Sequence, residues 1–383
     1  MQNGSRLVGQ HRGEGKKEAV NGNTKWGLSI VPPHHIWYNF ILSESIKGTF
    51  IMKRIAKKLL AMGLSIAMIF GFTQGVSAAD AEIAATDWMA EVSDDTFLSS
   101  VTVPGTHDSG TAYIFPSFFL QCQSLGFYDQ LNAGYRYLDI RLALDESEEN
   151  GTKLKFIHAF GTCKKESSFL QLFSDTLYLE DALDDVYTFL DEHPTETIIF
   201  SVKAENKEDD LSVFEDTFFQ ILDQHPEKWY TQNAIPSMGD VRGKIVLVTR
   251  FDDVNGEGEG RMGLPFHWSQ QDNTEAVVDT QEVVMVNDTN QLWVQDRYKY
   301  GVDMKWDAVV ESFENCQASD ETFSLNFLST SGSGKAGHPK KYARILNKQL
   351  MEYQFKPQTC YGVVIVDFGE EKEARHIFSA NFK

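Results

Sequence analysis

The sequence is short of basic residues and of cysteine. Its 383 residues contain 35 Lys or Arg against 55 Asp or Glu, a net charge of −20, and only four cysteines. An acidic chain repels a phosphate backbone, so nucleic acid is excluded as a partner, and tight electrostatic docking on an anionic membrane is disfavoured. A chain of this length can bury a large apolar core, so it does not need a disulfide framework to fold.

Several motifs are also absent. The sequence has no P-loop, HExxH zinc motif, nucleophile-elbow serine or internal repeat. These absences argue against nucleoside triphosphate chemistry, zinc-protease chemistry and serine hydrolysis. The apolar run over 59–72 is too short to span a bilayer comfortably.

The beginning of the chain has the composition of a leader. Residues 1–51 show no hydrophobic periodicity, and from Met52 the chain has a basic segment, an apolar run and a small-residue site ending at Ala78. This order is that of a secretory signal peptide over 52–78, so we expect Met52 to be the true start and residues 1–51 to be a mis-extended or disordered leader. The mature protein, 79–383, would then be secreted as one catalytic domain. A genuine long leader or a membrane anchor is the alternative.

Secretion would permit disulfide bonds. The four cysteines, all in the predicted mature region, are Cys122, Cys163, Cys316 and Cys360. Four cysteines allow three pairings, and the sequence does not select one of them.

Short apolar runs alternate with amphipathic helical segments and end in polar residues. The run over 101–103 meets Pro104 and Gly105 and then delivers His107 and Asp108. Parallel strands with their chemistry on the loops that follow are typical of an α/β barrel, so we predict a single distorted TIM-type (βα)8-like barrel. The polar residues expected at its top face are His107, Asp108, Asp139, Arg141, His158, Lys203, Arg250, Asp296, Tyr298 and Asp367.

One predicted strand carries charge on one of its faces. Alternation places Tyr137, Asp139 and Arg141 on one face and apolar residues on the other. A carboxylate and a guanidinium inside a closed fold are costly unless they pair or bind a ligand, and the guanidinium fork suits a phosphate. A structural ion pair is the alternative interpretation.

Two histidines in this set suggest acid–base catalysis on an anion. His107 and His158 each follow a predicted strand, and the ordinary histidine pKa of about 6.5 suits proton transfer near neutral pH. One histidine can deprotonate an internal hydroxyl, the other can protonate the leaving oxygen, and cations can stabilise the phosphorane between them. A carboxylate behind the base would fix its tautomer.

Seven motifs follow one another along the predicted mature region. They are VPGTHDSGT at 103–111, GYRYLDIR at 134–141, FIHAFG at 156–161, PTETIIFSVKAE at 194–205, RGKIVLVTRF at 242–251, VQDRYKY at 294–300 and GVVIVDF at 362–368. This set closely resembles the bacterial phosphatidylinositol-specific phospholipases C, from Trp88 to about Phe382. The resemblance implies a distorted barrel that cleaves phosphatidylinositol to diacylglycerol and inositol 1,2-cyclic phosphate, a phosphatidylinositol diacylglycerol-lyase.

The resemblance also implies a role for each polar residue. His107 would be the general base for the inositol 2-hydroxyl and His158 the general acid for the glycerol oxygen. Asp367 would orient His107, while Arg141 and Asp108 would act at the phosphate. The implied inositol-binding group is Lys203, Arg250, Asp296 and Tyr298, with the tyrosine ring stacked under the sugar.

No metal or other cofactor is expected. In the calcium-dependent eukaryotic relatives the counterpart of Arg141 is a carboxylate, whereas Asp139 and Arg141 here follow the metal-independent bacterial enzymes. An arginine can stabilise the charge of the phosphorane where calcium otherwise would. The sequence departs from the family at Ala159, where glycine is common after the acid histidine, and we expect the change to narrow the turn slightly.

Some features allow two interpretations. Cys122 and Cys163 follow the active-site strands closely and are candidates for a local disulfide. Phe115, Phe118 and Phe119 are either core residues or an interfacial patch that enters lipid.

The expected partner is phosphatidylinositol at a membrane surface, bound transiently by a monomer, and either the free lipid or a glycosylated anchor fits. One alternative is a metal-dependent glycerophosphodiester phosphodiesterase or sphingomyelinase D-like barrel, against which Arg141 argues. The other is a secreted module that binds inositol lipids without cleaving them, against which the two histidines argue.

Overall fold

The computed structural model describes residues 82–145, 152–166, 174–258, 260–333 and 337–382. All of the predicted site residues fall within these ranges, and Ala81–Lys383 forms one compact unit. The predicted leader, 1–51, and signal peptide, 52–78, lie outside the described residues. Within the described ranges, no helix has both the length and the apolar character needed to cross a membrane.

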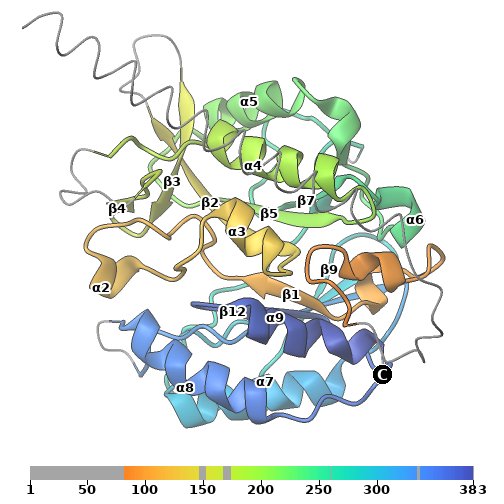
Figure 1. The fold of residues 1–383 in the computed structure, drawn as a ribbon. Helices are drawn as coiled ribbons and strands as arrows, with labels where there is room; N and C mark the ends of the chain where they lie inside the picture. The colour runs from red at the N-terminus through yellow and green to blue at the C-terminus, as the bar shows by residue number, and fades with distance from the viewer. Residues whose placement is uncertain (1–81, 146–151, 167–173, 259, 334–336, 383) are drawn as a thin grey trace, which may run out of the picture. The chain divides into compact units, whose positions relative to one another are not determined.

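A twelve-stranded sheet organises the fold (Figure 1). In spatial order its main path is β6 (Trp229–Tyr230), β7 (Ile245–Thr249), β5 (Ile198–Ala204), β2 (Tyr137–Asp145), β1 (Val103–Thr106), β12 (Val363–Val366), β11 (Thr322–Phe327), β10 (Gln291–Gln295) and β9 (Glu282–Met285). Neighbours on this path are parallel, except that β9 is antiparallel to β10. A further short strand, β8 (Leu264–Pro265), pairs in parallel with β7.

The predicted distorted α/β barrel is confirmed, with most of its strands parallel. Among the described residues, no hydrogen-bonded ladder joins β9 at one end of the sheet to β6 or β8 at the other. The antiparallel strand β9 ends the parallel series, and the barrel is therefore open along this seam.

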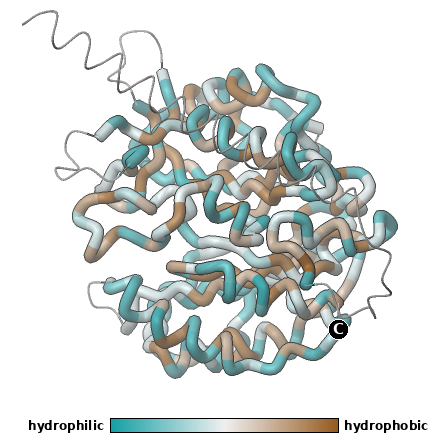
Figure 2. Tube along the Cα trace, viewed as in Figure 1, coloured by the Kyte–Doolittle hydropathy of each residue, from teal (hydrophilic) through white to brown (hydrophobic). Residues whose placement is uncertain are grey.

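Helices pack around the sheet. They are α2 (Ser117–Leu120), α3 (Phe127–Asn132), α4 (Leu179–Glu192), α5 (Leu211–Leu222), α6 (Met238–Val241), α7 (Val302–Asn315), α8 (Pro339–Glu352) and α9 (Glu371–Phe378), with 3-10 turns η1 (Trp88–Glu91), η2 (Leu98–Ser100), η4 (Pro226–Lys228) and η5 (Ser379–Asn381). Figure 1 shows α4 and α5 beside β2 and β5, and α7, α8 and α9 beside β12. Teal and brown alternate along α8 in Figure 2, as expected for a helix with one apolar face.

Alternation along the strands produces two apolar layers. On β2, Tyr137 lies in a cluster with Val246 and Ile365 from other strands, on the inner face of the sheet. Leu138 and Ile140 face the other way and pack in the cluster that contains the buried residues of α4. The predicted alternation on this strand is therefore confirmed.

The strand that delivers His158 was predicted to be parallel, and this is wrong. β3 (Lys153–His158) runs antiparallel to β2, with Phe156 opposite Leu142, and turns into the short strand β4 (Gly161–Thr162). Seven residues separate Asp145 from Lys153, fewer than the dozen or so that a crossover between parallel strands needs. The pairing of Phe156 with Leu142 returns the chain toward the part of β2 that carries Arg141, and His158 ends the returning strand.

Candidate active site

The register of β1 and β12 brings His107 and Asp367 together. Thr106 lies opposite Val366, the last residue of the other strand. The residues that follow them, His107 and Asp367, are therefore also neighbours. The Nδ1 atom of His107 lies 2.8 Å from Oδ1 of Asp367. A carboxylate only accepts, so Nδ1 carries the proton and Nε2 of a neutral His107 is left as a base.

Two carboxylates and two guanidinium groups form a buried network beside His107. Arg141 places Nε 3.0 Å from Oδ1 of Asp108 and Nη2 3.0 Å from Oδ2 of Asp139. Arg250 contacts the other oxygen of Asp139 at 3.1 Å. The backbone N–H of Asp108 also donates to Asp139 at 3.1 Å, which fixes the turn after β1. The network holds Arg141 with its charge facing the cavity.

His158 approaches the same carboxylate from the opposite side. Its Nδ1 lies 2.7 Å from the carbonyl oxygen of Leu120, which can only accept, so Nδ1 donates and Nε2 faces Asp108 at 3.4 Å. The Nε2 atom of His107 lies 3.1 Å from the same Asp108 oxygen. The two imidazole rings are 6.3 Å apart and nearly perpendicular. Asp108 thus stands between two proton-transferring groups.

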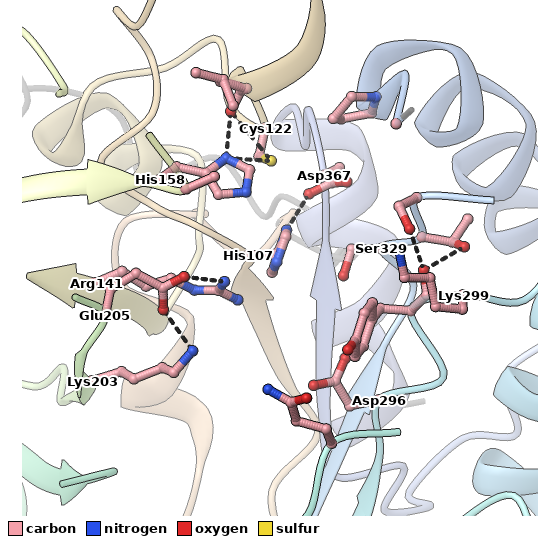
Figure 3. A pocket seen from close by; sticks show the side chains of 18 of the residues that line it. His107, Cys122, Arg141, His158, Lys203, Glu205, Asp296, Lys299, Ser329 and Asp367 are labelled. Atoms are coloured by element: carbon pink, nitrogen blue, oxygen red, sulfur yellow. Dashed lines mark hydrogen bonds and ion pairs between the residues drawn. The ribbon is translucent and has the colours of Figure 1, made fainter. Parts of the chain in front are cut away.

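These side chains face a cavity of about 640 Å³ (Figure 3). Figure 3 shows His107, His158 and Asp367 in the upper part of the view, Arg141 and Lys203 on the left and Asp296 on the right. Eight of the predicted site residues line the cavity: His107, Arg141, His158, Lys203, Arg250, Asp296, Tyr298 and Asp367.

Asp108 and Asp139 are the two predicted residues that do not line the cavity. Their side chains are 1% and 0% exposed, and they contact the histidines and arginines from behind. The implied role of Asp108 at the phosphate is therefore indirect in this structure, because its contacts go to His107, His158 and Arg141.

Several lining residues were missed by the sequence reasoning. An oxygen of Glu205 lies 2.5 Å from Nζ of Lys203. The two residues are separated by one position at the end of β5, so strand alternation could have predicted that Glu205 lies on the same side as Lys203. Trp268 donates from Nε1 to Asp296 at 3.2 Å and lies under the guanidinium of Arg250, 3.8 Å from its ring centroid. No sequence signal marked this tryptophan, because it lies on a loop.

Charge neighbours set the titration of the histidine base. Burial alone would lower the pKa of His107, but the carboxylates of Asp108 and Asp367 outweigh burial and raise this pKa to about 9. The free site therefore holds an imidazolium at neutral pH, and the neutral base becomes available as the pH rises.

Burial and neighbouring cations act on the other charged groups. Burial would raise the pKa of Asp139, but Arg141 and Arg250 hold it well below its ordinary value. Burial, and then the charge of Arg141, lowers the pKa of Lys203. A buried carboxylate, Asp139, therefore lies behind the cations that line the cavity. These cations suit an anionic ligand.

The residue directly after each of His107, His158 and Asp367 has a left-handed backbone. The φ angles are 45° at Asp108, 50° at Ala159 and 48° at Phe368. A side chain in this region costs about 1–2 kcal/mol, and aspartate tolerates it better than most residues. Ala159 therefore strains the turn after His158, where glycine would not; we had expected a slight narrowing instead.

The phenylalanines beside the site are exposed. Phe115, Phe118 and Phe119 are 67%, 63% and 41% exposed, so the core interpretation is wrong for them. Phe119 lines the cavity, and Phe160, two residues after His158, is 79% exposed. We call these four residues the phenylalanine patch.

The donors that could hold a metal ion are engaged in other contacts. Within the described residues, the groups with suitable spacing are His107, Cys122 and Asp367; Asp108, Cys122 and His158; and His107, Asp108 and Asp139. The imidazole Nδ1 atoms face Asp367 and a backbone carbonyl, and the carboxylates of Asp108 and Asp139 pair with Arg141. Burial raises the pKa of the Cys122 thiol well above its ordinary value, which disfavours a thiolate ligand. These residues do not fit a divalent cation site.

Together the fold and the site define an α/β-barrel enzyme with two histidines beside a fixed cation in one cavity, an arrangement that suits an anionic substrate. The family model described as "Phosphatidylinositol-specific phospholipase C, X domain" matches residues 106–251, which include both histidines, Arg141 and Arg250. The chain is therefore similar to the phosphatidylinositol-specific phospholipases C over this region.

Individual relatives agree with this assignment. The chain is 25% identical over 313 residues to a 1-phosphatidylinositol phosphodiesterase of Listeria monocytogenes, covering 77% of this chain and 84% of the relative. It is 27% identical over 340 residues to the Staphylococcus aureus enzyme of the same name, covering 83% and 94%. The Listeria monocytogenes phosphatidylinositol-specific phospholipase C structure has a TM-score of 0.60 at 24% identity and covers 79% of this chain and 100% of its own. A Staphylococcus aureus structure has a TM-score of 0.61 at 22% identity, covering 79% and 99%.

Proposed function

We propose that this protein is a phospholipase C that cleaves phosphatidylinositol to diacylglycerol and inositol 1,2-cyclic phosphate. The observation that carries the proposal is the pair of imidazoles whose Nε2 atoms both face the Asp108 carboxylate, next to Arg141. This arrangement offers one base, one acid and one fixed cation within a single cavity.

In the first half of the reaction, Nε2 of His107 accepts the proton of the inositol 2-hydroxyl. The oxygen then attacks the phosphorus and forms the cyclic bond. Asp367 stabilises the imidazolium through Nδ1 and keeps Nε2 directed at the cavity. A positioned base of this kind contributes about 10²–10⁴-fold to the rate.

In the second half, the bond between phosphorus and the glycerol oxygen breaks. Nε2–H of a protonated His158 gives its proton to that oxygen, and diacylglycerol leaves as an alcohol. The Leu120 carbonyl fixes the orientation of the ring through Nδ1. The Asp108 carboxylate lies 3.4 Å from Nε2 of His158.

Arg141 is proposed to stabilise the phosphorane without a metal ion. Its guanidinium is held by Asp108 and Asp139 and lines the cavity. A preorganised cation aimed at the developing charge is worth about 10²–10³-fold in rate. The charge is permanent, since the pKa of Arg141, which burial would lower, is raised further by its carboxylate neighbours.

The remaining charged groups suit the inositol ring. Arg250, Asp296 and Lys203 line the cavity with donors and acceptors for vicinal hydroxyls, and Tyr298 offers an aromatic face. Trp268, packed under Arg250, adds a second aromatic surface. This group is proposed to bind the headgroup, of the free lipid or of a glycosylated anchor.

The phenylalanine patch is proposed to contact the membrane during this reaction. Phe118 and Phe119 stand on α2 at 63% and 41% exposure, and Phe119 also lines the cavity. Apolar side chains next to a cavity entrance can enter the acyl region and hold the lipid phosphate at the site.

We also propose that the protein is secreted as a monomer after removal of residues 52–78.

Phosphorus NMR of the purified protein with phosphatidylinositol micelles and excess EDTA tests the proposal. A cyclic inositol phosphate signal is the expected result, and the His107→Ala variant should not produce it. Activity that appears only after calcium is added would overturn the role of Arg141. Release of inorganic or glycerol-linked phosphate, or no product in either condition, would overturn the assigned reaction.

A further inference from the structure

Two cysteines that the proposed function does not use lie in contact. Cys316 directly follows α7, and Cys360 lies shortly before β12. Their Sγ atoms are 3.8 Å apart, and both thiols are free. Cys316 is partly exposed, whereas Cys360 is 8% exposed.

Two backbone contacts hold the Cys360 sulfur in place beside Cys316. The Cys360 thiol lies 3.5 Å from the carbonyl oxygen of Ser99, and the N–H of Gly362 points at its sulfur at 3.4 Å. A disulfide bond is about 2.05 Å long, so each sulfur needs to move by about 1 Å. A side-chain rotation at Cys316 supplies such a movement, because this residue is partly exposed.

The other two cysteines have different surroundings. Cys122 lines the active-site cavity with Sγ 3.9 Å from Nδ1 of His158, and Cys163 is fully buried. Burial raises the pKa of both thiols. In contrast, the hydrogen bond with Cys360 lowers the pKa of Cys316, which favours its thiolate as a nucleophile.

We propose that Cys316 and Cys360 are a redox-active pair that closes to a disulfide when the protein meets a small-molecule disulfide as oxidant. The Cys316 thiolate attacks one sulfur of the oxidant and releases one thiolate from it. The Cys360 sulfur, after losing its proton, attacks the mixed disulfide at Cys316 and releases the second. The two cysteines lose two protons and two electrons, and the oxidant is reduced to two thiols.

The bond would close a loop that carries part of the cavity wall. β11 and α8 lie between the two cysteines, and Ser329, Thr330 and Ser331 of this stretch line the cavity. A cross-link over a loop of this length stabilises the folded protein mainly by restricting the unfolded chain. It would attach the end of α7 to the start of β12 without touching the histidines.

Thiol counting on the full-length protein tests the proposal. The protein is incubated with oxidised glutathione, quenched in acid and titrated with Ellman's reagent in denaturant. The expected count falls from four thiols to two, and a non-reducing peptide map links the Cys316 and Cys360 peptides. Dithiothreitol should restore the count of four. Four remaining thiols, a stable glutathione adduct, or a bond to Cys122 or Cys163 would each overturn the proposal.

Matched variants separate this pair from the rest. The Cys316→Ala variant should keep its three thiols on oxidation, whereas the thiol count of Cys163→Ala should fall from three to one. Oxidation should raise the thermal unfolding midpoint of the wild type by several degrees and leave that of Cys316→Ala unchanged. A bond that forms only above the unfolding midpoint would also contradict the proposal. None of these readouts uses lipid cleavage, so a failure of the proposed activity would be seen separately.

Discussion

The two sides of the cavity are built in different ways. On the catalytic side, Asp367 and His107 follow paired strands, and Asp139 and Arg141 stand on β2, so hydrogen-bonded register sets their spacing. On the headgroup side, the aromatic and charged groups come largely from loops after β7 and β10, and Lys203 keeps 34% of its side chain exposed.

This difference in construction matches a difference in proposed role: the catalytic side is preorganised, and the headgroup side recognises the inositol ring. The carboxylates of Asp108 and Asp139 are almost wholly buried and each contacts more than one partner, so their geometry is fixed before substrate arrives. Charges fixed in this way act on the transition state. Loop residues with partly exposed side chains can adapt to a hydroxyl-rich ring. Changes on the catalytic side should therefore lower kcat, and changes on the headgroup side should raise KM.

The largest effect is expected at the two histidines. His107→Ala and His158→Ala should each lower kcat by about 10²–10⁴-fold, because each removes a proton-transferring group. Circular dichroism and thermal unfolding should show an intact fold. His225→Ala is the matched control, since this exposed histidine precedes η4 outside the cavity, and it should keep full activity. Near-full activity in either active-site variant would refute the assigned acid–base pair.

A second test asks whether Arg141 acts as a fork or only as a charge. Arg141→Lys keeps a cation near Asp108 and Asp139 but loses the two-sided contact, so kcat should fall by about 10²–10³-fold with little change in KM. Assays in EDTA and in calcium should agree for the wild type. If Arg141→Lys retained wild-type kcat, the guanidinium geometry would not matter to the phosphorane.

The pH profile tests the partner of the base. Because the pKa of His107 is raised to about 9, log kcat/KM of the wild type should rise with pH until about 9, where the neutral base becomes the main form. Asp367→Asn removes one of the raising charges, so the rise should end at a lower pH. Loss of the orienting carboxylate should lower the plateau by about 10–100-fold. NMR titration of His107 gives the same pKa independently, and an unshifted value in Asp367→Asn would contradict the assignment.

The headgroup side should respond in KM. Asp296→Asn removes a charged acceptor from the cavity, and a hydrogen bond to a charged group is worth about 1.5–3 kcal/mol, so KM should rise about tenfold or more. Steady-state kinetics on short-chain phosphatidylinositol measure this split. Asp303→Asn, an exposed acid at the start of α7, serves as the control. If Asp296→Asn lowered kcat at constant KM, the proposed division between a catalytic side and a headgroup side would be wrong.

The smallest effect is expected in stability. Ala159→Gly relieves a left-handed residue, so it should raise the free energy of unfolding by about 1 kcal/mol and leave activity within about twofold. Ala182→Gly on α4 is the matched control, because glycine inside a helix should cost about 1 kcal/mol instead. Urea unfolding measures both. Destabilisation by Ala159→Gly would show that this turn is not strained.

Much of the catalytic side was predictable from sequence because it depends on strands. Period-two alternation assigned Asp139 and Arg141 to one face, and apolar runs that end in polar residues placed His107 and Asp367 at one end of the sheet. The amphipathic segments that the sequence shows between the apolar runs form helices in the structure, such as α4 and α5. These signals are local, and the tertiary fold did not override them.

The features that were missed depend on contacts between distant segments. The position of Trp88 depends on its stacking on Phe378 and on its hydrogen bond to the Gly134 carbonyl, segments far from it in the sequence. The contact of His158 with the Leu120 carbonyl has no side-chain signal, since every residue carries a carbonyl.

The helix α2 faces two environments with only four residues. Phe118 and Phe119 on this helix are exposed and also pack against the His338 ring, and the carbonyl of Leu120, at its end, holds the ring of His158. A displacement that lipid imposes on the phenylalanines would reach the proposed general acid through the backbone of a single residue. The segment that contacts the membrane and the segment that orients His158 are then the same short helix. We therefore expect membrane contact to affect His158 directly, with no intervening residues through which a distant mutation could uncouple the two.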